Sequence, residues 1–63
     1  MYELYDRVEH LPTGKSCIII DIEDGIDEET GIPVIVYALE VEDQSDQDWF
    51  YWAEESEIMR LQK

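Results

Sequence analysis

The stretch from Cys17 to Val41 holds two apolar arms separated by an acidic, turn-rich segment, and it constrains the fold more than any other part of the chain. Apolar side chains recur at every second position in both arms. They are Ile18, Ile20 and Ile22 in the first arm and Ile35, Tyr37, Leu39 and Val41 in the second. Because side chains two apart on a β-strand share a face, each arm presents one apolar face. The pattern predicts a long β-hairpin around which the rest of the chain folds.

Turn signals and alternating apolar residues divide the chain into five expected strands. They are predicted at Tyr2–Leu11, Ser16–Glu23, Val34–Glu42, Trp49–Ala53 and Ile58–Gln62, with a turn or a single 3-10 turn at Glu54–Glu57. Several short strands at near-regular spacing favour a small all-β sandwich or barrel, and closure into a barrel removes exposed strand edges. The alternative for the C-terminal segment is a helix from Ala53 to Gln62, because its residue types are good helix formers.

The order of these segments resembles that of the SH3-like small barrels, the group that includes Tudor and KOW-type domains, and of small stand-alone barrels of bacteria and phages. The resemblance rests on Tyr5 to Val8 at the start, Gly14 to Ile22 in the second strand and Glu55 to Leu61 at the end. It implies a five-stranded SH3-like barrel with a long acidic hairpin loop and a short 3-10 turn before the last strand. The basic residues of a KOW motif are missing around the second strand, so the resemblance does not extend to RNA binding.

The length of the chain fits one small domain, residues 1–63. A chain this short buries only about 60% of its unfolded surface, so its stability is marginal. Cys17 is the only cysteine and His10 the only histidine, which excludes an intramolecular disulfide and gives no zinc pattern. We expect no cofactor, and we expect the two Trp, four Tyr and one Phe, or association with another chain, to supply the missing buried area.

Charge narrows the choice of partner. Seventeen Asp and Glu against four Lys and Arg give a formal net charge of −13, and no Lys or Arg lies between Ser16 and Met59. Nucleic-acid affinity comes largely from Lys and Arg that neutralise phosphates, and anionic membranes repel an acidic surface. We therefore expect no direct binding to nucleic acid or membrane, and a basic protein surface as the partner. The alternative is that the acids only keep a small protein in solution.

The expected location is cytoplasmic. The N-terminal residues include Glu3 and Asp6 and lack the apolar core of a secretory signal. No apolar run approaches the roughly 18 residues that span a bilayer.

Catalysis and metal binding find little support. Cys17 and His10 are the only nucleophile–base pair of their kind, and we interpret them as a small buried cysteine and a surface histidine. Hard oxygen ligands suited to Ca²⁺ gather in one stretch, at Asp21, Glu23, Asp24, Asp27, Glu28 and Glu29. Neither Gly25 nor Gly31 falls at the sixth position that an EF-hand loop requires. We expect a solvated acidic loop, no metal site and no enzymatic activity.

The aromatic run Trp49-Phe50-Tyr51-Trp52 is the strongest candidate for a binding surface. On a strand, Trp49 and Tyr51 share one side and Phe50 and Trp52 the other, and we expect two of the four in the core and one or two exposed. Exposed Trp and Tyr are typical binding anchors, and acids beside them favour an Arg or Lys placed over a ring. The candidate partner-binding residues are Tyr37, Trp49, Tyr51, Trp52, Asp46, Asp48, Glu54 and Glu55. The resemblance to Tudor-like barrels adds that Tyr37, Trp49, Tyr51 or Trp52 resemble a cage for methylated Lys or Arg.

These observations predict a non-enzymatic acidic interaction module that docks a basic partner surface. Its sharper form is an inhibitor that mimics the charge of a nucleic acid. The alternative is a structural small-barrel homo-oligomer, in which the aromatic run is partly core and partly an interface between copies.

Overall fold

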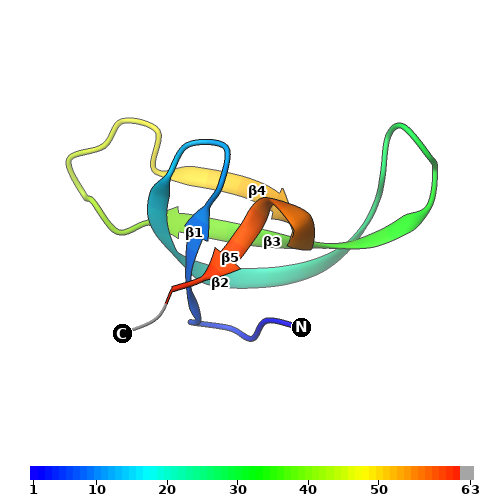
Figure 1. Cartoon of the computed structure of the whole chain (residues 1–63), viewed down its shortest axis with the longest axis horizontal. Coiled ribbons are helices and arrows are strands. Elements are labelled where there is room, and N and C mark those ends of the chain that lie inside the picture. Colours follow the sequence, from blue (N-terminus) through cyan, green and yellow to red (C-terminus); the bar gives the residue numbers. More distant parts are fainter. Residues whose placement is uncertain (62–63) are drawn as a thin grey trace.

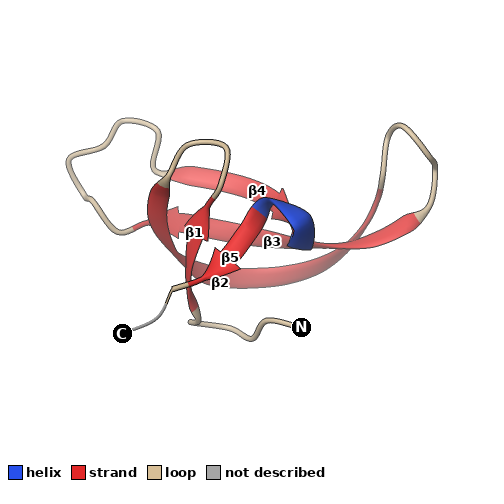
Figure 2. Ribbon diagram, viewed as in Figure 1, coloured by secondary structure: helices blue, strands red, loops and turns tan. Residues whose placement is uncertain are grey.

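The computed structural model describes residues 1–61. It contains β1 (Arg7–His10), β2 (Lys15–Ile26), β3 (Pro33–Val41), β4 (Phe50–Glu54), the 3-10 turn η1 (Glu55–Glu57) and β5 (Ile58–Arg60) (Figures 1 and 2). The all-β prediction with five strands and a 3-10 turn before the last strand is confirmed. The alternative helix over Ala53–Gln62 is wrong over the described part of that range, where η1 and β5 stand; Gln62 itself lies outside the described residues.

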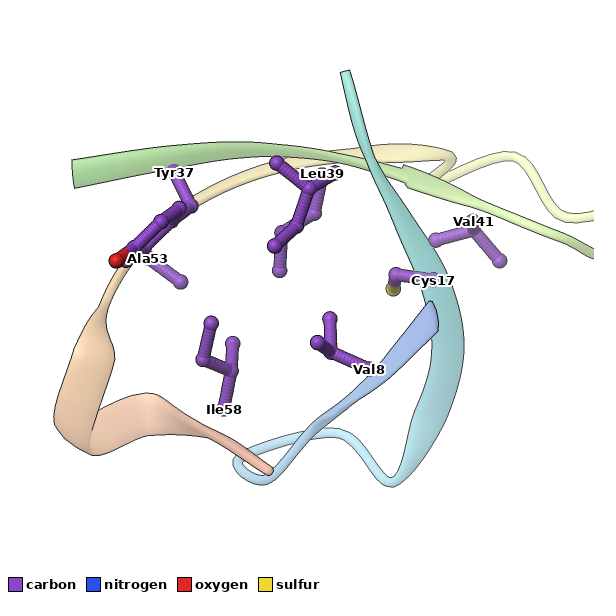
Figure 3. Packing of buried hydrophobic residues seen from close by; sticks show 8 residues of the cluster. Val8, Cys17, Tyr37, Leu39, Val41, Ala53 and Ile58 are labelled. Carbon is purple, nitrogen blue, oxygen red and sulfur yellow. The ribbon is translucent and has the colours of Figure 1, made fainter. Parts of the chain in front are cut away.

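All five strands form one antiparallel sheet in the order β4-β3-β2-β1-β5. The long strand β2 pairs with β1 over its first residues and with β3 along most of its length, and it curves so that the sheet wraps around an interior (Figure 3). The expected closure into a barrel is not met, because no ladder joins β4 to β5 within residues 1–61. At this seam the Glu54 N–H donates to the Glu57 carboxylate, 2.9 Å away, instead of to a strand.

A β-bulge changes which isoleucines of β2 are buried. The pairing of β2 with β3 is regular up to Ile19 opposite Leu39 and resumes at Asp21 opposite Ala38, which leaves Ile20 as an extra residue. An extra residue moves the following side chains to the other face. The predicted inward set of Ile18, Ile20 and Ile22 is therefore wrong. Cys17 and Ile19 are fully buried, Ile20 is exposed, and only Ile22 packs against the core.

The interior is lined by aliphatic side chains, one cysteine and one tyrosine, and all five strands contribute to it. Fully or almost fully buried are Val8, Cys17, Ile19, Tyr37, Leu39, Val41, Ala53 and Ile58 (Figure 3). The prediction that Tyr37, Leu39 and Val41 share the inward face of β3 is confirmed, with Ile35 packed at its margin. His10 is also buried, with its Nδ1 2.8 Å from the Thr13 hydroxyl oxygen, so the expectation of a surface histidine is wrong.

The first strand and the hairpin loop are shorter than predicted. Tyr5 adopts a φ of 70°, which bends the chain before β1, so the regular ladder begins at Arg7. Ahead of it, the Tyr5 N–H donates to the Ile19 carbonyl and the Ile19 N–H donates to the Asp6 carbonyl. The strand β2 continues to Ile26, and the connection to β3 shrinks to residues 27–32. Asp27 organises this turn: its carboxylate accepts the N–H groups of Glu29 and Thr30 at 2.8 and 3.2 Å. Asp24 to Ile26 of the long acidic loop expected from the sequence are thus strand, and the shorter connection keeps Asp27, Glu28 and Glu29.

Candidate functional site

The strand β4 lies at one end of the sheet and shows a strict alternation of inward and outward side chains. Tyr51 and Ala53 face the interior, where Ala53 is buried and Tyr51 half-buried. Phe50 and Trp52 face outward with 37% and 51% of their surface exposed, and Trp49, just before the strand, is 52% exposed. The expectation that two of the four aromatics belong to the core is wrong, because Ala53 rather than a second aromatic fills the interior position next to Tyr51.

The outward aromatic rings contact one another in a short ladder. Trp49 and Phe50 meet edge to face with ring centroids 5.8 Å apart, and Phe50 meets Trp52 in the same way at 5.6 Å. Ala38 lies opposite Trp52 on β3 and is only 2% exposed although it faces outward, since larger neighbours shield it. On β2, Ile18 lies opposite Glu40 in the same outward row as Phe50, and the exposed Ile20 is the extra residue of the neighbouring bulge. We call Ile18, Ile20, Ala38, Trp49, Phe50 and Trp52 the outer apolar patch.

Carboxylates border the outer apolar patch along the same rows of the sheet. Register places Glu40 between Ile18 and Phe50, and it places Glu54 in one row with Val36 and Glu23. The side chain of Glu23 shares a hydrogen bond with that of Asp21, which raises the pKa of Glu23. Partial desolvation, followed by repulsion from Asp27, Glu57 and Glu29, raises the pKa of Glu54. We call Asp21, Glu23, Glu40 and Glu54 the acidic rim.

A hollow of about 490 Å³ lies beside Trp52, between the end of β4, η1 and the turn of the β2–β3 hairpin. Trp52 and Val36 contribute apolar surface, and the polar part consists mainly of carboxylates. These carboxylates are Asp27, Glu28, Glu29, Glu54 and Glu57. The arrangement offers one aromatic wall and several negative charges to any group that enters, which suits a guanidinium or an ammonium.

The basic side chains of the described residues are engaged away from this hollow. The Arg7 guanidinium forms a two-pronged contact with the Glu42 carboxylate, the closest pair of atoms being 2.9 Å apart. Lys15 Nζ lies 2.8 Å from the Asp46 carboxylate, and Arg60 lies 3.3 Å from that of Asp6. The carboxylates of the acidic rim therefore have no cation of the described chain among their ion-pair partners.

The eight predicted partner-binding residues do not form one surface. Tyr37 is 1% exposed and belongs to the core. Tyr51 stacks on His10 at 4.5 Å and binds Lys15 Nζ through its hydroxyl at 2.9 Å, on the inward side of β4. Asp46 pairs with Lys15, and Glu55 lies 3.5 Å from the amino group of Met1.

Four of the eight stay near the exposed aromatics. Two of them, Trp49 and Trp52, belong to the outer apolar patch, and Glu54 belongs to the acidic rim. The fourth, Asp48, lies beside Trp49 and Phe50. Sequence reasoning missed Phe50, Ile18 and Ile20. Phe50 could have been found from its position two residues from Trp52, but Ile18 and Ile20 depend on the bulge. Because Tyr37 and Tyr51 both point inward, the suggested aromatic cage for methylated Lys or Arg is not assembled.

The other chemistry weighed from the sequence has little geometric basis. Cys17 is fully buried, and its Sγ lies 3.7 Å from the Lys15 carbonyl, while His10 contacts Thr13. In the part of the chain that the structure describes, no three His, Cys, Asp or Glu side chains are grouped to hold a metal ion. Over the same residues, no helix has the length and apolarity to cross a membrane.

Comparison with known proteins gives no relative of this chain, so its class is described from its fold and its surface. No protein-family model, no curated protein and no solved structure matches it. The class that the coordinates define is a small all-β protein with one curved, five-stranded antiparallel sheet and an exposed aromatic face bordered by acids.

Proposed function

We propose that this chain is a non-enzymatic, acidic protein-interaction module that docks a basic surface of a partner protein in the cytoplasm. The observation that carries the proposal is the position of the acidic rim beside the outer apolar patch. Three exposed aromatic rings adjoin carboxylates that no basic side chain of the described residues neutralises. Exposed aromatic patches of this kind are characteristic of protein-binding surfaces.

The fold proposed for this module is an SH3-like small barrel. Supporting it are the sheet order, with β1 between β2 and β5, and the 3-10 turn that precedes the last strand. The Tyr51 and His10 rings stack at 4.5 Å and connect β4 to β1 across the interior, although β4 and β5 do not pair. Such a fold holds Phe50 and Trp52 on its outside while Tyr51 helps to close the inside.

The chemistry of docking combines two contributions. A guanidinium or ammonium placed over Trp52 gains about 0.5–2 kcal/mol from the ring, depending on how far water is excluded. The neighbouring carboxylates of Glu54 and Glu40 add attraction that salt weakens. The partner surface is therefore expected to carry Arg or Lys beside apolar groups, rather than charge alone.

Two narrower forms of the proposal lead to different behaviour. A mimic of nucleic-acid charge relies on carboxylates, so its binding falls steeply with salt and tolerates loss of Trp52. A homo-oligomer, favoured by the unpaired edge of β4 beside exposed rings, associates without any partner. Light scattering at micromolar concentration tests the homo-oligomer, because the finding of a monodisperse monomer would exclude it.

The test is recovery of a partner by the immobilised chain from a cell lysate at about 30 mM and about 500 mM NaCl, a range over which surface charges become screened. The variant Trp52→Ala is compared with Leu11→Ala, which removes an exposed apolar side chain from the turn between β1 and β2. We expect a basic protein that binds the parent chain and Leu11→Ala at low salt but not Trp52→Ala, confirmed with purified components. Equal recovery by all three chains, or an acidic partner, would refute the proposal.

A further inference from the structure

We propose that the partner contributes an extended basic segment that adds antiparallel to the open edge of β4 and places alternate Arg or Lys side chains over the outer apolar patch. This inference rests on the proposed docking function and specifies how docking occurs. Two features of the molecule carry it, the edge of β4 that no strand of the described chain pairs with and the aromatic rings beside that edge.

The hydrogen-bonding direction of β4 follows from two contacts at its ends. The Trp49 carbonyl accepts the Val41 N–H at 2.8 Å and so points toward β3. The Glu54 N–H donates to the Glu57 carboxylate at 2.9 Å and so points away from β3. Backbone groups alternate in direction along a strand, and in an antiparallel pair both groups of one residue point to the same side. The N–H and C=O of Phe50 and Trp52 are therefore directed to the open edge, where the described chain supplies no strand.

This edge has no Lys, Pro or bulge in β4 that would block strand pairing. Natural edge strands are commonly blunted by Lys, by Pro, by a bulge or by a covering segment. The sequence of β4 is Phe-Tyr-Trp-Ala-Glu, without Lys or Pro, and its pairing with β3 is regular. Only its last N–H, at Glu54, is taken by a side chain. The strand thus offers backbone groups at Phe50 and Trp52 to an added strand.

The geometry couples backbone pairing to side-chain position. Phe50 and Trp52 carry both the open-edge backbone groups and the outward side chains. In an antiparallel pair, the residue directly opposite each of them exchanges both hydrogen bonds and points its side chain to the same face. The partner residues that donate N–H groups to β4 are therefore the ones whose side chains lie next to the rings of Phe50 and Trp52 and the carboxylate of Glu54.

Charge selects a basic segment over a second copy of this chain. Two copies paired edge to edge through β4 would join molecules of formal net charge −13 each. Antiparallel pairing centred on Trp52 would also bring Glu54 of each copy opposite Phe50 of the other, burying a carboxylate against a ring. A segment with Arg or Lys at alternate positions instead places cations beside Trp52 and Glu54, and like-charge repulsion is replaced by attraction.

The test uses a blocked eight-residue peptide of alternating Arg and Thr as the probe. Two derivatives carry methyl groups on backbone nitrogens, one at Arg positions and the other at Thr positions. Both keep the charge and sequence of the parent, but each removes a different set of N–H donors. Dissociation constants are measured by titration calorimetry at low salt, with the parent chain and with Leu11→Ala as a control that should bind equally.

We expect methylation at Arg to weaken binding about tenfold or more, because two backbone hydrogen bonds to β4 are lost. Methylation at Thr should change the affinity about twofold or less, since those nitrogens face solvent. In the complex with the unmodified peptide, hydrogen exchange at the Phe50 and Trp52 amides should slow markedly.

Three results would overturn strand addition. Equal affinity of both methylated peptides and the parent would leave docking of a basic surface intact while excluding pairing with β4. A loss confined to the Thr-methylated peptide would contradict the antiparallel arrangement. If no peptide binds although the chain still recovers a basic partner from lysate, the partner docks through a folded surface, and the inference fails while the proposed function stands.

Discussion

Tyr37 shows how much stability one side chain provides in a molecule of this size. It is 1% exposed, meets the Tyr2 ring edge to face at 5.7 Å, and accepts only a long hydrogen bond of 3.5 Å from the Tyr2 N–H. We expect Tyr37→Ala to cost about 3–5 kcal/mol, the range for removing a buried aromatic ring. A 63-residue domain has roughly 3–9 kcal/mol in total, so this variant should lose a third of its stability or more.

The hydroxyl of Tyr37 should matter much less than its ring. We expect Tyr37→Phe to remain folded with a loss of about 1 kcal/mol or less, because the bond it loses is long. Urea unfolding followed by circular dichroism measures both variants. A Tyr37→Ala nearly as stable as the parent chain, or a Tyr37→Phe as unstable as Tyr37→Ala, would contradict the packing described for β3.

Cys17 provides a second test at the level of one residue. Its side chain is fully buried, and burial, reinforced by the nearby Glu42 carboxylate, raises the pKa of the thiol. Both effects suppress the reactive thiolate. We expect a thiol reagent such as DTNB to modify native Cys17 at least about a hundredfold more slowly than the urea-unfolded chain, in keeping with an opening equilibrium of a few kcal/mol. Rapid modification of the folded protein would indicate an accessible nucleophile and reopen the question of catalysis.

The turn between β2 and β3 depends on one glycine for its backbone conformation. Gly31 has a φ of +72°, with open space where a Cβ would stand, and its N–H donates to the Asp27 carbonyl at 2.8 Å. We expect Gly31→Ala to destabilise the protein by about 1–2 kcal/mol from backbone strain alone. The control Glu28→Ala changes an exposed position of the same turn and should stay within about 0.5 kcal/mol of the parent. Equal effects of the two substitutions would show that the strain argument is wrong.

The strand β2 also shows where sequence reasoning fails at the level of elements. Alternation predicted both the strand and its partner β3, and turn chemistry placed the boundaries of β3, β4 and η1 within about a residue or two. The run Cys17-Ile18-Ile19-Ile20, however, is apolar at every position, so no periodicity reveals which face is inward. The bulge at Ile20 is decided by the pairing of Ile19 and Asp21 with β3, which is a long-range contact.

At the scale of the whole molecule, the sequence shows the size and the sign of the net charge, but not where the charged side chains lie on the folded surface. The sequence predicted an acidic surface and an exposed aromatic on β4. It did not predict that Arg7, Lys15 and Arg60 each pair with a carboxylate. The partners, Glu42, Asp46 and Asp6, are each distant in sequence from the cation they bind, and their approach depends on strand order. The acidic rim becomes a candidate site only once these pairs are known.

The same distribution of carboxylates predicts how stability changes with pH. The pKa of Glu23 is raised by its hydrogen bond with Asp21, and that of Glu54 by desolvation and by Asp27, Glu57 and Glu29. A group whose folded-state pKa is raised binds more protons in the folded than in the unfolded chain. Its ionised form therefore lowers the stability of the folded protein at pH values above the folded-state pKa. This loss of stability disappears as the pH falls toward the ordinary glutamate pKa of about 4.3.

Two other carboxylates have lowered pKa values and therefore reduce the stability of the fold at low pH. Hydrogen bonds from Ser45 lower the pKa of Asp43, and those from Lys15 and the Asp48 N–H lower that of Asp46. Stability from these groups is present above the ordinary aspartate pKa of about 3.9 and is lost as the pH falls through their lower folded-state values.

Thermal melts at constant ionic strength should therefore give a Tm that rises as the pH falls from 7 toward the ordinary glutamate pKa of about 4.3, and that decreases again below the ordinary aspartate pKa of about 3.9. Repulsion within a chain of formal net charge −13 acts in the same direction as the rise. Glu23→Gln should increase Tm at pH 7 and reduce the gain on acidification, because the uncharged amide no longer repels Asp21. A Tm that decreases steadily from pH 7, or a gain unaffected by Glu23→Gln, would show that these carboxylates do not interact as the fold places them.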